Sequence, residues 1–150
     1  MSVRYFYALF AAALLGSMSC AAEPTVIPDK FSAGIGGFFG STYGVVLRDG
    51  ALHYTERKPR TGPGAEATSS ATITPTAEQW REFRRSIDEL GVWRWRSDYS
   101  DSAIMDGTRW RLELAYSDHS LKTAGSNKYP EHFDRYLAAV QKLLGGRPFK

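Results

Sequence analysis

The chain has 150 residues, of which 43% are hydrophobic, 23% charged and 13% aromatic, and its formal net charge is +3. This composition is that of one globular domain, and it excludes a disordered tail, a fibre and a polytopic membrane protein. One cysteine cannot form an internal disulfide, and three histidines offer little material for a zinc site or for histidine-based catalysis. The basic excess is small and accompanies no recognition motif, so we expect no nucleic-acid partner and no cofactor.

The amino terminus has the order of a secretory signal. A short basic start ends at Arg4, residues 5–15 are apolar, and residues 16–22 are mostly small. The apolar run is too short to span a bilayer. We therefore predict that residues 1–22 are a signal peptide and that the protein is exported.

Cys20 leaves two outcomes open for this signal. Cleavage before Cys20 would give a lipid-modified first residue and a lipoprotein of the outer membrane, whereas cleavage before Glu23 would give a soluble periplasmic protein. Ser19 favours lipidation, but Ser17 stands where such signals usually carry leucine. Neither outcome leaves a free thiol in an oxidising compartment. A lipid anchor is the only membrane contact that we expect.

Residues 23–44 contain the glycine- and aromatic-rich run FSAGIGGFFGSTYG at 31–44. The run has neither the ending of a phosphate loop nor the spacing of a dinucleotide-binding loop. We interpret it as a lead-in whose aromatic rings pack onto the core; the alternative is an aromatic and glycine lip with a binding role. A single domain is predicted over residues 45–146.

Turn signals and alternation predict the strands in chain order. Asp49 and Gly50 form a two-residue hairpin turn, which sets Leu47 opposite Leu52 and Val45 opposite Tyr54 on one apolar face. Further strands are expected over 71–74, 92–96, 108–116 and 120–123.

Two amphipathic helices complete the pattern. The first begins at Thr74-Pro75, or at Thr76 with Gln79 in capping-box spacing, and ends at Gly91; the second opens at Pro130 and closes at Gly145-Gly146. We predict an α+β fold, with an antiparallel sheet of five to six strands and both helices on one face. This two-layer arrangement would consist of two ββα-type halves.

Three segments resemble small uncharacterised bacterial secreted or lipoprotein domains. They are Trp93-x-Trp95, Asp106-Gly107-Thr108-Arg109-Trp110 and Gly125-Ser126-Asn127-Lys128-Tyr129-Pro130, within a likeness over residues 43–145. The resemblance implies the architecture and an envelope location, and it carries over no activity.

Catalytic and metal-binding patterns are weak. His53, His119 and His132 have no partner at metal-ligand spacing, and Asp98, Asp101 and Asp106 share a loop without the EF-hand pattern. The single cysteine lies in the export signal. We therefore expect neither catalytic residues nor a metal site; whether the aspartate loop holds an ion stays open.

Arginines supply the clearest binding hypothesis. In the two predicted strands over 92–96 and 108–116, alternation puts tryptophans on one face and Arg94, Arg96, Arg109 and Arg111 on the other. Such a face is either balanced internally, by Glu113 or the aspartate loop, or it docks an acidic protein or polyanion.

These features lead us to expect an exported, non-catalytic protein-binding domain of the bacterial envelope. An inhibitor or immunity protein against a toxin or a cell-wall-degrading enzyme fits them best. The alternatives are a structural or assembly lipoprotein of the outer membrane and a carboxylate-based cell-wall hydrolase.

Overall fold

The glycine-rich stretch forms the central strand of a β-sheet. The computed structural model describes residues 26–37, 40–59, 68–101 and 107–150. Strand β1 (Lys30–Gly36) pairs antiparallel with β2 (Thr42–Arg48) on one side and with β6 (Arg109–Ala115) on the other. Residues 30–36 are therefore not a lead-in. Glycine lowers strand propensity, and this hid an alternation in which Phe31, Ala33 and Ile35 are buried.

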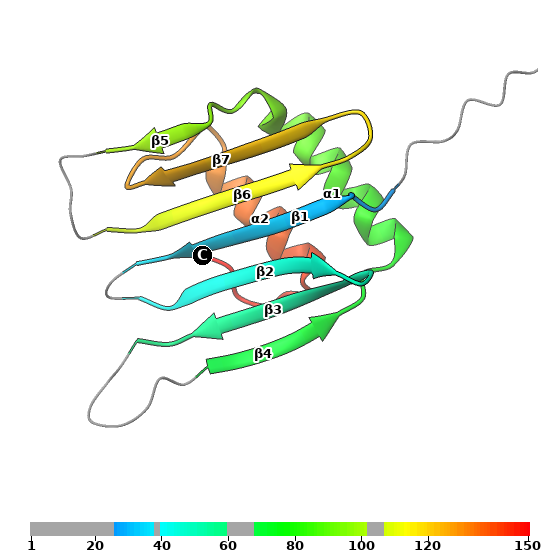
Figure 1. Ribbon diagram of the computed structural model, residues 1–150, viewed down its shortest axis with the longest axis horizontal. Helices are drawn as coiled ribbons and strands as arrows, with labels where there is room; N and C mark the ends of the chain where they lie inside the picture. Colours follow the sequence, from blue (N-terminus) through cyan, green and yellow to red (C-terminus); the bar gives the residue numbers. More distant parts are fainter. Residues whose placement is uncertain (1–25, 38–39, 60–67, 102–106) are drawn as a thin grey trace, which may run out of the picture.

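Within the described residues, the sheet has seven strands in the order β4-β3-β2-β1-β6-β7-β5 (Figure 1). The remaining strands are β3 (Ala51–Arg57), β4 (Thr68–Ile73), β5 (Asp98–Ser100) and β7 (Ser120–Ser126). Among the described strands, only β5 and β7 pair in parallel. The α+β class, a mostly antiparallel sheet and two helices are confirmed, whereas the predicted count of five to six strands is too low.

Local signals placed the first hairpin and the first helix correctly. Leu47 pairs with Leu52 and Val45 with Tyr54, as the Asp-Gly turn predicted. Helix α1 (Ala77–Glu89) starts after Thr76, whose side chain accepts a hydrogen bond from the Gln79 N–H while the Gln79 side chain accepts one from the Thr76 N–H. This reciprocal capping box fixes the second of the two predicted helix starts.

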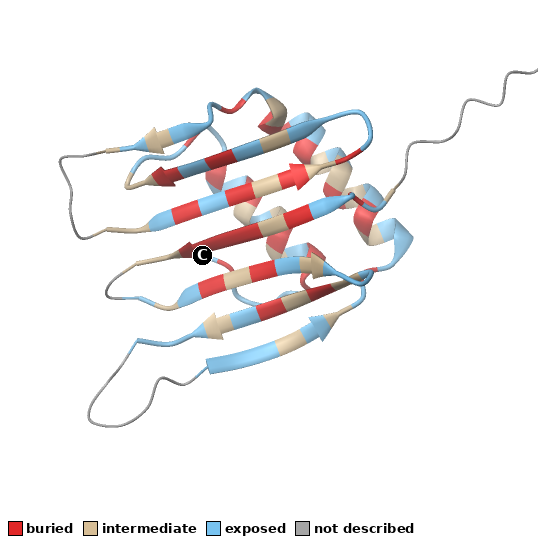
Figure 2. Ribbon diagram, viewed as in Figure 1, coloured by how far each residue is buried: buried red, intermediate tan, exposed pale blue. Residues whose placement is uncertain are grey.

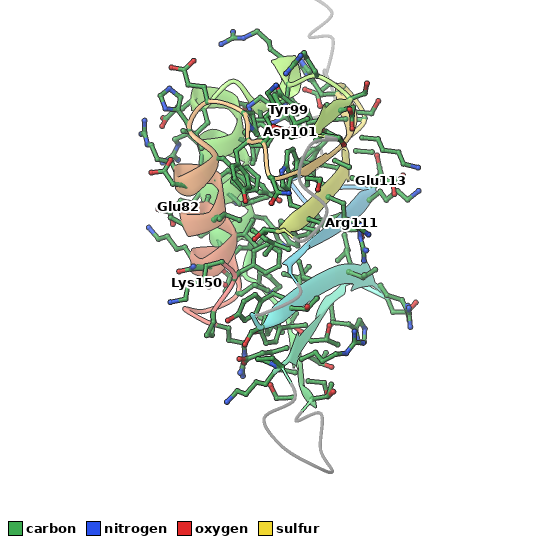
Figure 3. All side chains as sticks on the ribbon, turned by 90° about the vertical axis from the view of Figure 1, so that its left-hand side faces the viewer. Glu82, Tyr99, Asp101, Arg111, Glu113 and Lys150 are labelled. Atoms are coloured by element: carbon green, nitrogen blue, oxygen red, sulfur yellow. The ribbon has the colours of Figure 1, made fainter. Side chains whose placement is uncertain are left out.

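Both helices lie on the same side of the sheet in Figures 1 and 3. In β2, β3, β6 and β7, the buried residues alternate with intermediate or exposed ones (Figure 2), because successive side chains point to opposite faces. Phe31 of β1 packs edge-on against Trp80 of α1, with ring centres 6.2 Å apart. Trp110 of β6 packs against Phe133, the first residue of α2 (Phe133–Leu143), at 4.7 Å. The core thus lies between the sheet and the helices.

Residues 92–96 do not form the predicted strand. Gly91 adopts a left-handed conformation with φ of 66° at the end of α1, and a 3₁₀ turn, η1 (Val92–Arg94), follows it. Val92 and Trp95 are both buried, and this three-residue spacing suits a tight helical turn rather than a strand. The alternation of tryptophan and arginine over residues 93–96 is compatible with a strand and with a tight helical turn. The left-handed conformation of Gly91 favours the turn.

Candidate functional site

Two of the four arginines predicted to share a sheet face do so. Arg109 and Arg111 are exposed on β6, on either side of the buried Trp110. Figure 3 shows Arg111 and Glu113 projecting from the side of the sheet away from the helices, which we call the open face. Alternation places Arg109 on the open face as well.

Arg94 and Arg96 lie away from this pair, which corrects the predicted face of four arginines. Arg94 belongs to η1, and its guanidinium lies over Gly91, where a Cβ atom would overlap with it. The guanidinium of Arg96 lies 4.6 Å from the ring centre of Tyr99. Both positions follow from the helical turn that replaces the expected strand.

A third arginine lies across a groove from Arg109 and Arg111. The groove has a volume of about 740 Å³, and the exposed Arg57 of β3 lines its other side. Its lining also includes three threonines and three glycines: Thr42, Thr55, Thr68, Gly34, Gly36 and Gly44. We call this feature the arginine groove.

The strand register builds the arginine groove. Gly36 pairs with Arg109 and Gly34 pairs with Arg111, so β6 forms one wall beside a glycine-bearing β1. On the next strand Gly44 pairs with Gly34. Thr42 of that strand pairs with Arg57 of β3, which forms the opposite wall. Strands β1 and β2 are therefore the floor.

Two glycines of the floor have different roles. A Cβ atom at Gly34 would be in ordinary contact with Arg111, at 3.5 Å from Nε and Cζ, so the arginine side chain lies across this glycine. A Cβ atom at Gly36 would come within 2.5 to 2.7 Å of Thr42. Gly36 is thus needed for strand packing, whereas Gly34 leaves room for the Arg111 side chain that lies over it.

The positive charge in the arginine groove has no internal counter-charge among the described residues. No acidic residue in that part of the chain lines the groove or forms an ion pair with its three arginines. Glu113, one of the two internal counter-charges considered for these arginines, forms a hydrogen-bonded salt bridge with Lys30 at 2.8 Å. That hydrogen bond and the nearby Lys122 hold the pKa of Glu113 below its usual value.

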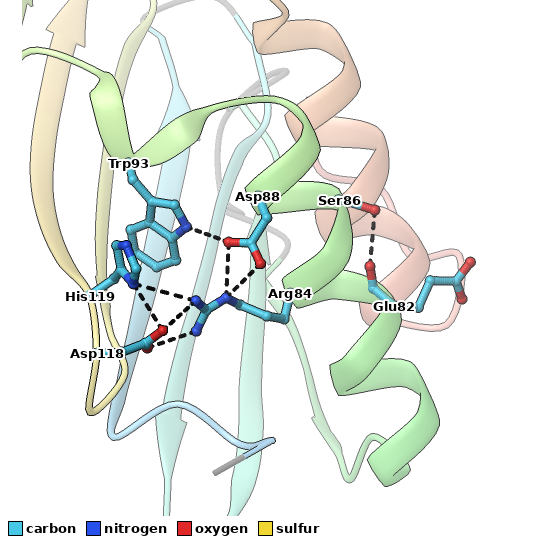
Figure 4. A network of polar contacts seen from close by, with 7 residues as sticks. All are labelled: Glu82, Arg84, Ser86, Asp88, Trp93, Asp118 and His119. Carbon is cyan, nitrogen blue, oxygen red and sulfur yellow. Dashed lines mark hydrogen bonds and ion pairs between the residues drawn. The ribbon is translucent and has the colours of Figure 1, made fainter. Parts of the chain in front are cut away.

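A second arginine cluster lies on the helix side of the molecule (Figure 4). Arg84 of α1 binds Asp88 one turn later and Asp118 in the turn between β6 and β7, at 3.0 and 2.8 Å. Its guanidinium lies 5.2 Å from the ring centre of Trp93 and 4.6 Å from that of Tyr116. We call these five residues the Arg84 cluster; it joins α1, η1 and the β6–β7 hairpin.

The titration of the Arg84 cluster follows from these contacts. Hydrogen bonds from Arg84, and then from His119, hold the pKa of Asp118 well below its usual value. Burial raises the pKa of the Tyr116 hydroxyl. Trp93 also donates a hydrogen bond from Nε1 to Asp88, at 2.6 Å. Every charged group of the cluster therefore has a partner inside the protein.

The three histidines that were considered as ligands belong to different elements. His53 is on β3, His119 binds Asp118, and His132 stands before α2 with Nε2 3.4 Å from Glu131. Within the described ranges, no three His, Cys, Asp or Glu side chains gather where they could hold a metal ion. Asp98 accepts a hydrogen bond from Ser100 at 2.7 Å.

Several features predicted from the amino-acid sequence fall outside the described residues: Cys20 and the rest of the expected signal, Phe38 and Phe39 of the lip alternative, and Asp106 of the aspartate loop. None of the helices in the described part is long and apolar enough to cross a membrane.

Comparison with known proteins gives no match, either to a protein-family model or to a curated protein. The likeness to small secreted bacterial domains stays a prediction. Functional inference therefore rests on the arginine groove and the Arg84 cluster.

Sequence reasoning missed Arg57 and Arg84. Arg57 continues the alternation of His53 and Thr55 on the outward face of the predicted hairpin, so extending that pattern by two residues would have found it. Arg84 and Asp88 have the four-residue spacing of a helical ion pair. No local pattern in the sequence indicates that Asp118 is a second partner of Arg84.

Proposed function

We propose that the chain is an exported, non-catalytic protein-binding domain of the bacterial envelope, with the arginine groove as its binding surface. An inhibitor or immunity protein against a toxin or cell-wall-degrading enzyme is the role that we favour. The observation that carries the proposal is the meeting of three exposed arginines on the open face, none of which forms an ion pair with another described residue.

Charge and chemistry support an acidic partner. Guanidinium groups bind carboxylates through two parallel hydrogen bonds, and the groove adds hydroxyl groups that donate and accept. Three cations close together repel one another, and a partner's carboxylates would relieve that repulsion. In the two-layer packing that we propose, the helices cover one face of the sheet, so the open face is free to dock.

Capture from a periplasmic extract tests the proposal. The tagged protein is compared with the double variant Arg109→Glu/Arg111→Glu and with Arg48→Glu, a matched control because Arg48 is exposed on β2 but does not line the groove. We expect a specific acidic protein to be retained by the wild type and the control and lost by the double variant. Equal retention by all three proteins would contradict the proposal.

The predicted envelope location has its own test. Mass spectrometry of the exported protein distinguishes a lipid-modified Cys20 from an unmodified start at Glu23. Either product supports export, whereas an intact amino terminus after expression in a bacterial host would contradict it.

A further inference from the structure

The spacing of the two arginines on β6 carries information about their ligand. Arg109 and Arg111 are two residues apart on one face of a strand, so their Cα atoms are about 6.6 to 6.8 Å apart. An extended peptide repeats its side chains at the same interval along one edge. Carboxylates on alternate residues of such a peptide would therefore meet the two guanidinium groups one to one.

The width of the arginine groove suits a chain lying along the strands. The walls β6 and β3 are separated by β1 and β2, which makes three strand spacings, or about 14 Å between backbones. The floor between them carries glycine and threonine, and the Arg111 side chain lies over Gly34, so a chain in the groove would lie against this arginine. A volume of about 740 Å³ lies within the range of pockets that enclose a ligand.

The groove surface favours a peptide over a nucleic acid. Single-stranded nucleic acids bind where aromatic rings stack on their bases. The only two aromatic residues among the described lining, Tyr43 and Trp110, are 7% and 3% exposed and belong to the core. What the groove presents is threonine hydroxyls, which hydrogen-bond to peptide groups, and guanidinium forks, which match carboxylates.

We infer that the arginine groove binds an extended acidic segment of the partner protein, with carboxylates on alternate residues facing Arg109 and Arg111. Successive side chains of an extended chain point in opposite directions, so the remaining side chains of the same segment face Arg57 on the opposite wall. This inference rests on the proposed function and names the kind of partner segment that the surface takes.

Synthetic peptides test the inference directly. A labelled peptide with glutamates on alternate residues is compared with a peptide of the same composition whose glutamates are adjacent, and with inorganic phosphate and a single-stranded oligonucleotide as competitors. We expect the alternating peptide to bind at least tenfold more tightly than its isomer, with affinity that falls steeply as salt rises. Displacement by the oligonucleotide or by phosphate at comparable concentration would overturn the inference, as would equal binding of the two peptides.

Two substitutions and one control variant test where the peptide binds. Arg111→Gln should weaken the alternating peptide at least tenfold, whereas Arg48→Gln on the same face should leave its affinity unchanged. Gly34→Val should also abolish binding, because the valine side chain would displace the Arg111 side chain that lies over this glycine. Circular dichroism and thermal denaturation verify that each variant is folded, and unchanged affinity in a folded Gly34→Val protein would place the peptide elsewhere.

The inference and the proposed function can fail separately. If capture of the partner depends on Arg109 and Arg111 but no alternating peptide binds, the groove recognises a folded surface and only the inference is wrong. If capture does not depend on these arginines, the proposed function itself is wrong.

Discussion

The two arginine regions of this protein use the same side chain in opposite ways. Arg84 is 20% exposed, binds two carboxylates and lies over two aromatic rings. Arg57, Arg109 and Arg111 are exposed, and no described residue forms an ion pair with them. An arginine whose partners are internal stabilises the fold, whereas one without them is available to a ligand.

The difference follows from the elements that carry the residues. Arg84 lies on α1 and faces the turn between β6 and β7. Side chains from α1, η1 and this turn surround its guanidinium (Figure 4). The groove arginines stand on an open sheet face, where the residues paired with them on neighbouring strands are glycine, alanine, serine and threonine and carry no charge. Substitutions in the Arg84 cluster should therefore lower stability more than binding. Substitutions in the arginine groove should lower binding more than stability.

The largest effect on stability is expected for Arg84→Ala. The change removes two charge-assisted hydrogen-bonded contacts and two ring contacts, so we expect a loss of about 2 kcal/mol in the free energy of unfolding. Urea denaturation measures it, and peptide binding should not change. Arg85→Ala is the matched control, since Arg85 is the next helical residue and is exposed. Equal losses for both variants would show that the Arg84 cluster adds no stability.

Within the groove floor, Gly36→Ala and Gly34→Ala should differ. Because the new Cβ at Gly36 would overlap with Thr42, overpacking should cost about 1 to 2 kcal/mol. The Cβ at Gly34 meets only contacts of 3.5 Å, so stability should stay within about 0.5 kcal/mol of the wild type. Thermal denaturation of the pair provides the comparison. A Gly34 variant that is the less stable of the two would refute this division of roles.

Acid should reveal a smaller contribution from the Arg84 cluster. The folded-state pKa of Asp118 lies below its unfolded value, so its contribution to stability is complete above about pH 4 and is lost as pH falls further. Arg84→Ala removes the main cause of that shift. We therefore expect the stability of this variant to decline less steeply below pH 4 than that of the wild type. Parallel acid-unfolding curves would show that the pairing does not depend on protonation of Asp118.

The smallest effect on stability is expected where the effect on binding is largest. Arg109→Ala and Arg111→Ala remove exposed side chains without an ion-pair partner among the described residues, so stability should change by less than about 0.5 kcal/mol. Each variant should nevertheless weaken partner capture. A destabilisation as large as that of Arg84→Ala would mean that these arginines have a structural role.

Much of this fold could be predicted because the deciding interactions are local. The Asp-Gly turn fixed the pairing of Leu47 with Leu52, and Thr76 with Gln79 fixed a helix start. Strand β1 was missed because its stability comes from pairing on both sides, at positions distant in the sequence. Glycine alternation on that strand looked like a loop when considered without its neighbours.

The candidate site was only half predictable for the same reason. Arg109 and Arg111 share a face by alternation alone, which any regular strand ensures. Their relation to Arg57 requires the sheet order, which places β6 beside β1 instead of beside β5, the strand that immediately precedes it in sequence. Arg94 and Arg96 were assigned to the wrong surface because a four-letter alternation does not distinguish a strand from a tight turn.

The central claim is that the open face, and not the Arg84 cluster, is the binding surface. Titration of isotope-labelled protein with the alternating acidic peptide, followed by amide resonances in NMR, tests it most directly. Binding in the groove should shift the amides of Gly34, Gly36 and Gly44 and leave those of Gly145 and Gly146, at the end of α2, in place. Saturating binding that shifts the amides around Arg84 and leaves the three floor glycines unchanged would contradict it.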